Sequence, residues 1–202
     1  MNVKLFLGIT AVIVGLIGYA PYFRNIIIGK TKPHAFSWLV WGILTGIAFV
    51  GQITSQGGFG TWVTGFTAFI CILIFTFALW KGSKDFPISD WLCLAGAGIA
   101  LVLWVITKSA LTAILLVSII DALGFIPTFR KSYLRPNEET VFTYIMSGFK
   151  FIIGIVALNK LSPVTVIYPC SIIITNLLFV VMVQIRRQQL GRYTYSSKIQ
   201  RF

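Results

Sequence analysis

The chain has 202 residues, of which 57% are hydrophobic and 11% are charged, and its mean hydropathy is +0.88. A soluble domain of ordinary composition carries about 25% charged residues, so this balance excludes a soluble globular protein. The net charge of +12 would suggest a nucleic-acid partner in a soluble protein. Here the basic residues lie in the breaks between apolar stretches, where they indicate membrane topology and no nucleic-acid binding.

Seven apolar stretches follow one another along the chain, separated by short breaks rich in glycine, proline and asparagine. Each is near the length at which an α-helix crosses about 30 Å of hydrocarbon. The sequence therefore predicts an all-α membrane protein with seven transmembrane helices, with the lipid bilayer as its surroundings. In chain order, the predicted helices cover residues 4–24, 35–54, 60–80, 89–107, 110–130, 139–158 and 162–185.

Lys and Arg residues are distributed unevenly between the two ends of these helices. Thirteen lie on the side that includes the polar tail from Arg186, and three lie on the other side. Because cytoplasmic segments are enriched in Lys and Arg, we expect the N-terminus outside and the C-terminus in the cytoplasm. The compact loops are typical of a bacterial inner membrane protein.

The chain contains an internal repeat. A shift of 106 residues superposes the first three predicted helices on the last three, and it aligns identical residues near the end of the first helix of each unit. With one helix between them, both units run in the same direction across the membrane. We expect a first three-helix repeat at 1–85, a linker helix at 86–109, a second repeat at 110–186 and a basic cytoplasmic tail at 187–202. The identities are Gly18/Gly124, Pro21/Pro127, Phe23/Phe129, Arg24/Arg130, Phe36/Phe142 and Gly42/Gly148.

These repeated segments resemble the PQ-loop and SWEET (MtN3-like) transporter superfamily. The resemblance is carried by the two runs that begin at Pro21 and Pro127, each followed by a basic loop and by a helix that opens with Phe-Ser or Phe-Thr. It implies two parallel three-helix repeats joined by a linker helix (3-1-3), a substrate bound near the membrane midplane, and alternating access. It also implies that both prolines act as hinges of a cytoplasmic gate. The alternative is a helix that ends near a basic loop.

Asp121 and Lys150 are the ionisable side chains that we place deep in the membrane, at matching depths. An unpaired charge at the bilayer centre costs about 3 kcal/mol on insertion scales, so each residue needs a partner or a wet cavity. Three interpretations stay open. The two residues form a structural ion pair, or a pair coupled to protons or substrate, or they make no direct contact.

Four side chains are candidates for substrate binding. Asn176 is expected near the middle of the last helix, where its amide needs partners within the bundle, and the resemblance implies that an Asn there contacts substrate. Thr67 and its neighbour Thr64 are candidates for a polar lining, although such hydroxyls also bond their own helix. Trp41 could stack on a flat ligand or pack in the core. Gln52 lies close to the position where the resemblance implies a substrate-stacking Trp.

The sequence contains no HExxH or GxxxxGK[ST] motif and no cluster of Cys or His residues. We therefore expect no metal, no cofactor, no catalytic residue and no enzymatic activity. The function predicted is that of a secondary transporter or facilitator for a small polar metabolite, sugar-like or amino-acid-like. The alternative is a membrane receptor or accessory protein on the same scaffold. Formation of a homo-oligomer stays open.

Overall fold

The computed structural model of the chain describes residues 2–31, 33, 35–82, 88–134, 136–138 and 140–199. Every regular element in this part is helical, so the prediction of an all-α protein is confirmed. Two of the elements are short 3₁₀ helices. The elements are α1 (Val3–Ile27), α2 (Ala35–Thr54), η1 (Gly58–Thr61), α3 (Trp62–Lys81), α4 (Ile88–Thr107), α5 (Ala110–Gly124), α6 (Ile126–Leu134), η2 (Pro136–Glu138), α7 (Val141–Val156) and α8 (Pro163–Ile199).

Five helical segments in the described part are long and apolar enough to cross a membrane. A sixth, Val141–Val156, is apolar but shorter. Lipid offers no hydrogen-bond partner to the backbone, which is why such segments are helices. These segments identify the chain as an integral membrane protein. The five are Val3–Ile27, Ser37–Thr54, Gly58–Lys81, Ala110–Leu134 and Pro163–Leu190.

Two predicted helices differ from the observed ones by more than a few residues at their ends. The stretch predicted as one helix at 110–130 is divided, because α5 ends at Gly124 and α6 begins at Ile126. Pro127 is the second residue of α6, a position where the missing proline N–H costs no helical hydrogen bond. The last helix continues to Ile199 instead of ending at 185, since polar residues prolong it beyond its apolar part.

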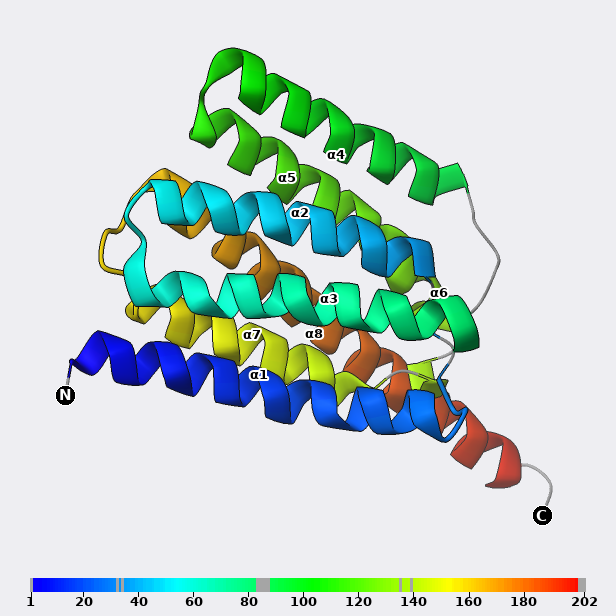
Figure 1. The fold of residues 1–202 in the computed structure, drawn as a ribbon. Coiled ribbons are helices and arrows are strands. Elements are labelled where there is room, and N and C mark those ends of the chain that lie inside the picture. The colour runs from blue at the N-terminus through cyan, green and yellow to red at the C-terminus, as the bar shows by residue number, and fades with distance from the viewer. Residues whose placement is uncertain are drawn as a thin grey trace.

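The helices lie side by side in one bundle (Figure 1). In the first half of the chain, α3 packs against both α1 and α2, and in the second half α8 packs against both α5 and α7. Between the halves, α1 packs against α7 and α2 packs against α5. The remaining helix, α4, lies against α5 on the side of the bundle opposite α1.

Small residues allow α1 and α7 to approach closely. Gly8, Ala11, Gly15 and Gly18 are buried at intervals of three or four residues, which places them on one face of α1. A Cβ atom at Gly18 would lie 2.7 Å from the Cβ atom of Met146 on α7. Contacts between small residues are typical of helices that associate in membranes, where van der Waals packing replaces the hydrophobic effect.

One end of the bundle is closed by the segment between α2 and α3. The backbone N–H of Asn159 donates to the Gly57 carbonyl oxygen (2.8 Å). At Gly60, a Cβ atom would overlap the carbonyl oxygen of Gly154 on α7. The Lys4 ammonium donates to the Asn159 carbonyl oxygen (3.3 Å) and so ties α1 to the same corner. These contacts pack α1, α7 and the α2–α3 segment closely together at this end.

Replacing Gly60 with alanine should therefore destabilise the closed end. We expect Gly60→Ala to lower the free energy of unfolding by about 1–3 kcal/mol, the usual cost of overpacking, as measured by thermal unfolding of the purified protein in detergent. Gly46→Ala is the matched control, because a Cβ atom there meets nothing within 4 Å. Equal unfolding temperatures for the two variants would contradict the close contact at Gly60.

Candidate functional site

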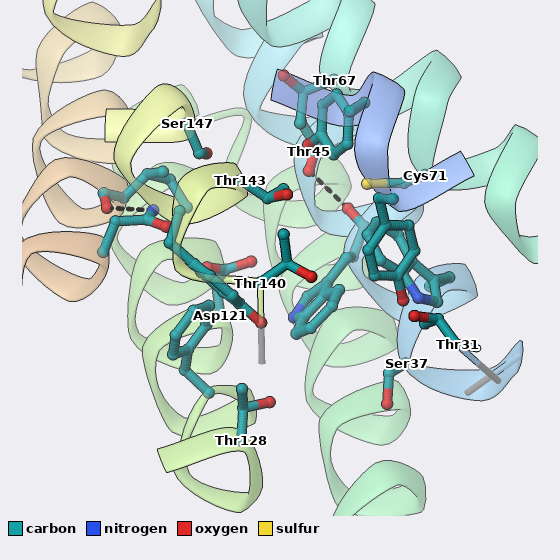
Figure 2. A pocket seen from close by; sticks show the side chains of 18 of the residues that line it. Thr31, Ser37, Thr45, Thr67, Cys71, Asp121, Thr128, Thr140, Thr143 and Ser147 are labelled. Carbon is teal, nitrogen blue, oxygen red and sulfur yellow. Dashed lines mark hydrogen bonds between the residues drawn. The ribbon is translucent and has the colours of Figure 1, made fainter. Parts of the chain in front are cut away.

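A cavity of about 810 Å³ lies among α1, α2, α3, α5, α7 and α8. Its lining begins at the loop residues Gly29, Lys30 and Thr31 on one side and Asn137 on the other, and it reaches Tyr168 in the interior. The labelled side chains of Figure 2 come from both halves of the chain and surround a common space. The cavity therefore extends from the loop end opposite the closed corner to the middle of the helices.

The lining follows the internal repeat. Seven pairs of positions that are 106 residues apart contribute both members to the cavity wall. Most of these side chains are aromatic or carry a hydroxyl group. The pairs are Tyr19/Phe125, Tyr22/Thr128, Thr31/Asn137, Ser37/Thr143, Trp38/Tyr144, Trp41/Ser147 and Thr45/Phe151.

Asp121 belongs to a chain of hydrogen-bonded groups in the cavity wall. Its carboxyl group bonds the Tyr168 hydroxyl, which lies 3.0 Å from the Thr45 hydroxyl. The Thr45 hydroxyl in turn donates to the Trp41 carbonyl oxygen (2.6 Å). These contacts connect α5, α8 and α2 within the cavity wall.

Lys150 lies directly behind the cavity wall, with 0% of its surface exposed. Its ammonium donates to the Thr67 hydroxyl (2.7 Å) and to the Tyr19 hydroxyl (3.3 Å). The same nitrogen is 4.6 Å from the centroid of the Tyr19 ring and 5.1 Å from that of Phe151. All three of these partners line the cavity. Aromatic faces and hydroxyl groups therefore stabilise this buried charge.

Asp121 and Lys150 do not form an ion pair in this conformation, and their hydrogen bonds go to different residues. The helix packing explains why. Lys150 lies on α7, which faces α1, and its side chain passes Gly15, where a Cβ atom would lie 3.2 Å from the Lys150 Cδ atom. Asp121 lies on α5, which faces α2. The two charged residues therefore lie at similar depth in the bundle but in different helix–helix contacts.

Three of the predicted substrate-binding residues line the cavity. Thr67 does so while its hydroxyl donates to the Val63 carbonyl oxygen (2.6 Å) of its own helix. Asn176 donates from its amide nitrogen to the Ile172 carbonyl oxygen (2.7 Å), and its own carbonyl oxygen makes no hydrogen bond. Trp41 stands at an angle of 89° to Trp38, with ring centroids 5.2 Å apart. The Asn176 carbonyl oxygen is thus free to accept from a ligand.

Gln52 does not line the cavity. It lies on α2 beyond the cavity's inner end, where its amide nitrogen donates to the Thr165 carbonyl oxygen (3.0 Å). The predicted hinges also differ from one another. Pro21 lies inside α1, which continues to Ile27, whereas Pro127 lies next to the break between α5 and α6, and its side chain falls outside the described residues.

Several wall residues were not among the candidates from sequence, notably Tyr19, Thr45 and Tyr168. The signal for Tyr19 was present, since the 106-residue shift pairs it with Phe125 and both are aromatic. Tyr168 carried the same signal, because the shift pairs it with the aromatic Trp62. Thr45 gave none, because a hydroxyl-bearing residue in an apolar helix is equally compatible with bonding its own backbone.

Comparison of the chain with models of known protein families, with curated proteins and with solved structures finds no match. Within the described residues, no three His, Cys, Asp or Glu side chains lie close enough together to hold a metal ion. The chemistry of the cavity therefore has to be argued from its hydroxyl, amide, aromatic and charged groups.

The contact between Lys150 and Thr67 makes a prediction for a double-mutant cycle. The single changes Lys150→Met and Thr67→Val should be non-additive in the free energy of unfolding by about 1.5–3 kcal/mol, the range for hydrogen bonds to charged groups. Thr76→Val is the matched control, because Thr76 is exposed on α3 and bonds only its own helix. Thermal unfolding in detergent provides the measurement.

A second double-mutant cycle tests whether Asp121 and Lys150 interact directly. With Asp121→Asn in place of Thr67→Val, we expect losses that nearly add, because Asp121 and Lys150 form neither an ion pair nor a hydrogen bond with each other. A coupling between Asp121 and Lys150 that exceeds the coupling between Lys150 and Thr67 would contradict the arrangement described.

Proposed function

We propose that the protein is a secondary transporter or facilitator that moves a small polar metabolite across the membrane by alternating access. The observation that carries this proposal is the cavity, which is open at one end of the bundle, reaches its middle and is closed at the other end. A carrier with alternating access needs such a one-sided cavity in each of its states.

The cavity wall supports a small polar ligand that has at least one flat face. A volume of about 810 Å³ falls within the usual range for small-molecule sites. Hydroxyl groups and the Asn176 carbonyl oxygen offer hydrogen bonds, and the Trp38 and Trp41 rings offer faces for stacking. Sugar-like and amino-acid-like molecules have both properties.

We further propose a 3-1-3 arrangement of seven transmembrane helices, in which α4 and α7 are the two spans in addition to the five segments named above. Two observations support it. The packing of α3 between α1 and α2 has its counterpart in α8 between α5 and α7, and the α1–α7 contact has its counterpart in α5–α2. The seven pairs of wall positions follow the same 106-residue shift. This arrangement is the one implied by the resemblance to the PQ-loop and SWEET superfamily.

Transport is tested by uptake into proteoliposomes across a panel of radiolabelled sugars and amino acids. We expect uptake of at least one class, and a loss of about ten-fold or more for Asn176→Leu, because the ligand then faces an apolar group in place of an acceptor. Gln188→Leu is the control, since Gln188 is an exposed amide on the same helix. Saturable binding of a panel member without any uptake would instead support a receptor or accessory protein.

The orientation proposed from the charge distribution has its own test. An epitope tag after Phe202 should be cytoplasmic, because most Lys and Arg residues lie on that side. The tag should then react with an impermeant reagent only after the cells are permeabilised, while a tag before Met1 reacts in intact cells. Reaction of the C-terminal tag in intact cells would reverse the orientation.

A further inference from the structure

The helix faces that line the cavity continue beyond it into the closed half of the bundle. On α2, the wall residues Trp38, Trp41 and Thr45 are followed at the same helical spacing by Ala48 and Gln52, both buried. Residues at intervals of three and four lie on one helix face. The α2 face that meets the cavity therefore ends in a polar side chain within the closed half.

The other two lining helices show the same continuation. On α3, the wall residue Thr67 is preceded by one turn by Thr64, and on α8 the wall residue Tyr168 is preceded by Thr165. Both threonines are fully buried. Three helices thus extend the polar face of the cavity toward the closed corner, whereas a purely structural closure inside a membrane would be apolar.

A proline creates the polar group that Gln52 contacts. Pro169 lies inside α8 and has no N–H, so the carbonyl oxygen of Thr165, four residues earlier, has no partner in the helix backbone. The Gln52 amide nitrogen donates to that oxygen (3.0 Å). This hydrogen bond joins α2 to the interrupted turn of α8, a position at which a helix bends readily.

Two polar atoms in the closed half have no hydrogen-bond partner. They are the Gln52 carbonyl oxygen Oε1 and the Thr64 hydroxyl oxygen Oγ1, and both residues are 0% exposed. Leaving a buried polar atom unpaired costs about 1–3 kcal/mol. That cost is removed when the closed half opens and water or a polar ligand reaches these atoms.

We propose that the closed half contains the second half of the translocation path, lined by Gln52, Thr64 and the Thr165 carbonyl oxygen and opened by bending of α8 at Pro169. The inference rests on the proposed transport function and names the residues that a small polar ligand meets after it leaves the cavity. Gln52 accordingly contacts the ligand in the conformation open at the opposite end, outside the present cavity.

Thiol labelling tests the path without knowledge of the substrate. In a full-length protein whose three native cysteines are replaced by alanine, Thr64→Cys and the control Ala113→Cys are reconstituted in sealed vesicles. Ala113 is equally buried and near the same end of the bundle, but it belongs to the apolar core. An impermeant thiol reagent is added from the side opposite the C-terminal tail.

We expect the reagent to modify Thr64→Cys about ten-fold faster than Ala113→Cys, because only Thr64 meets water in the second conformation. Equal rates at the two positions in a protein that transports would overturn this inference and leave the transport function standing. Uptake of no compound in the panel would overturn the transport function, whereas the labelling rates would still decide whether the path opens.

A valine in place of Thr64 supplies an independent measurement. Thr64→Val removes the unpartnered hydroxyl and keeps the shape of the side chain, so the closed conformation gains stability. We expect a higher unfolding temperature together with slower uptake, since opening becomes less favourable. Thr76→Val is the control on the exposed face of α3 and should change neither quantity. An unchanged or lower unfolding temperature for Thr64→Val would contradict the proposal.

Discussion

A polar group within a membrane-embedded helix bundle has no lipid partner, so it has to bond another group of the protein or face a wet cavity. Most features of this molecule follow from that constraint. The Lys150 ammonium bonds Thr67 and Tyr19 and lies over aromatic rings. Asp121 bonds Tyr168 at the cavity wall. Each buried charge is therefore held by hydroxyl-bearing residues that also line the cavity, and a change in the cavity affects the partners of both charges.

The difference between the two ends of the bundle also has a simple physical basis. Glycines between α2 and α3 allow the backbone to contact α7 without intervening side chains, which closes one end. At the other end a cavity lies between the helices, and its wall combines packed aromatic rings with hydroxyl groups. The alternation proposed above would exchange one set of contacts for the other, and the turn of α8 that Pro169 interrupts is the place proposed for that change.

The sequence predicted the helices better than it predicted the contacts between them. The length of the apolar stretch predicted a helix at 35–54, and the structure has a helix with the same bounds, because hydrocarbon thickness sets the length of a membrane-spanning helix. The sequence did not predict the division of 110–130 into two helices. A proline near the end of an apolar stretch is equally compatible with a kink within one helix and with the start of a second helix. The matching depths of Asp121 and Lys150 are visible from the sequence, but depth gives no rotational position about the bundle axis. Which helix each one faces follows from packing, and the pattern in which α1 contacts α7 and α2 contacts α5 is tertiary information.

We infer that the cavity is a wet chamber that opens at the end of the bundle carrying the C-terminal tail. Ser147 lies in its wall (Figure 2), whereas Ser118 on α5 is buried and bonds its own helix. The direct measurement is the labelling of Ser147→Cys and Ser118→Cys by an impermeant thiol reagent applied to each side of oriented, ligand-free vesicles. We expect the reagent to modify Ser147→Cys from the tail side and Ser118→Cys from neither side. Modification of Ser147→Cys only from the opposite side, or from neither side, would contradict it.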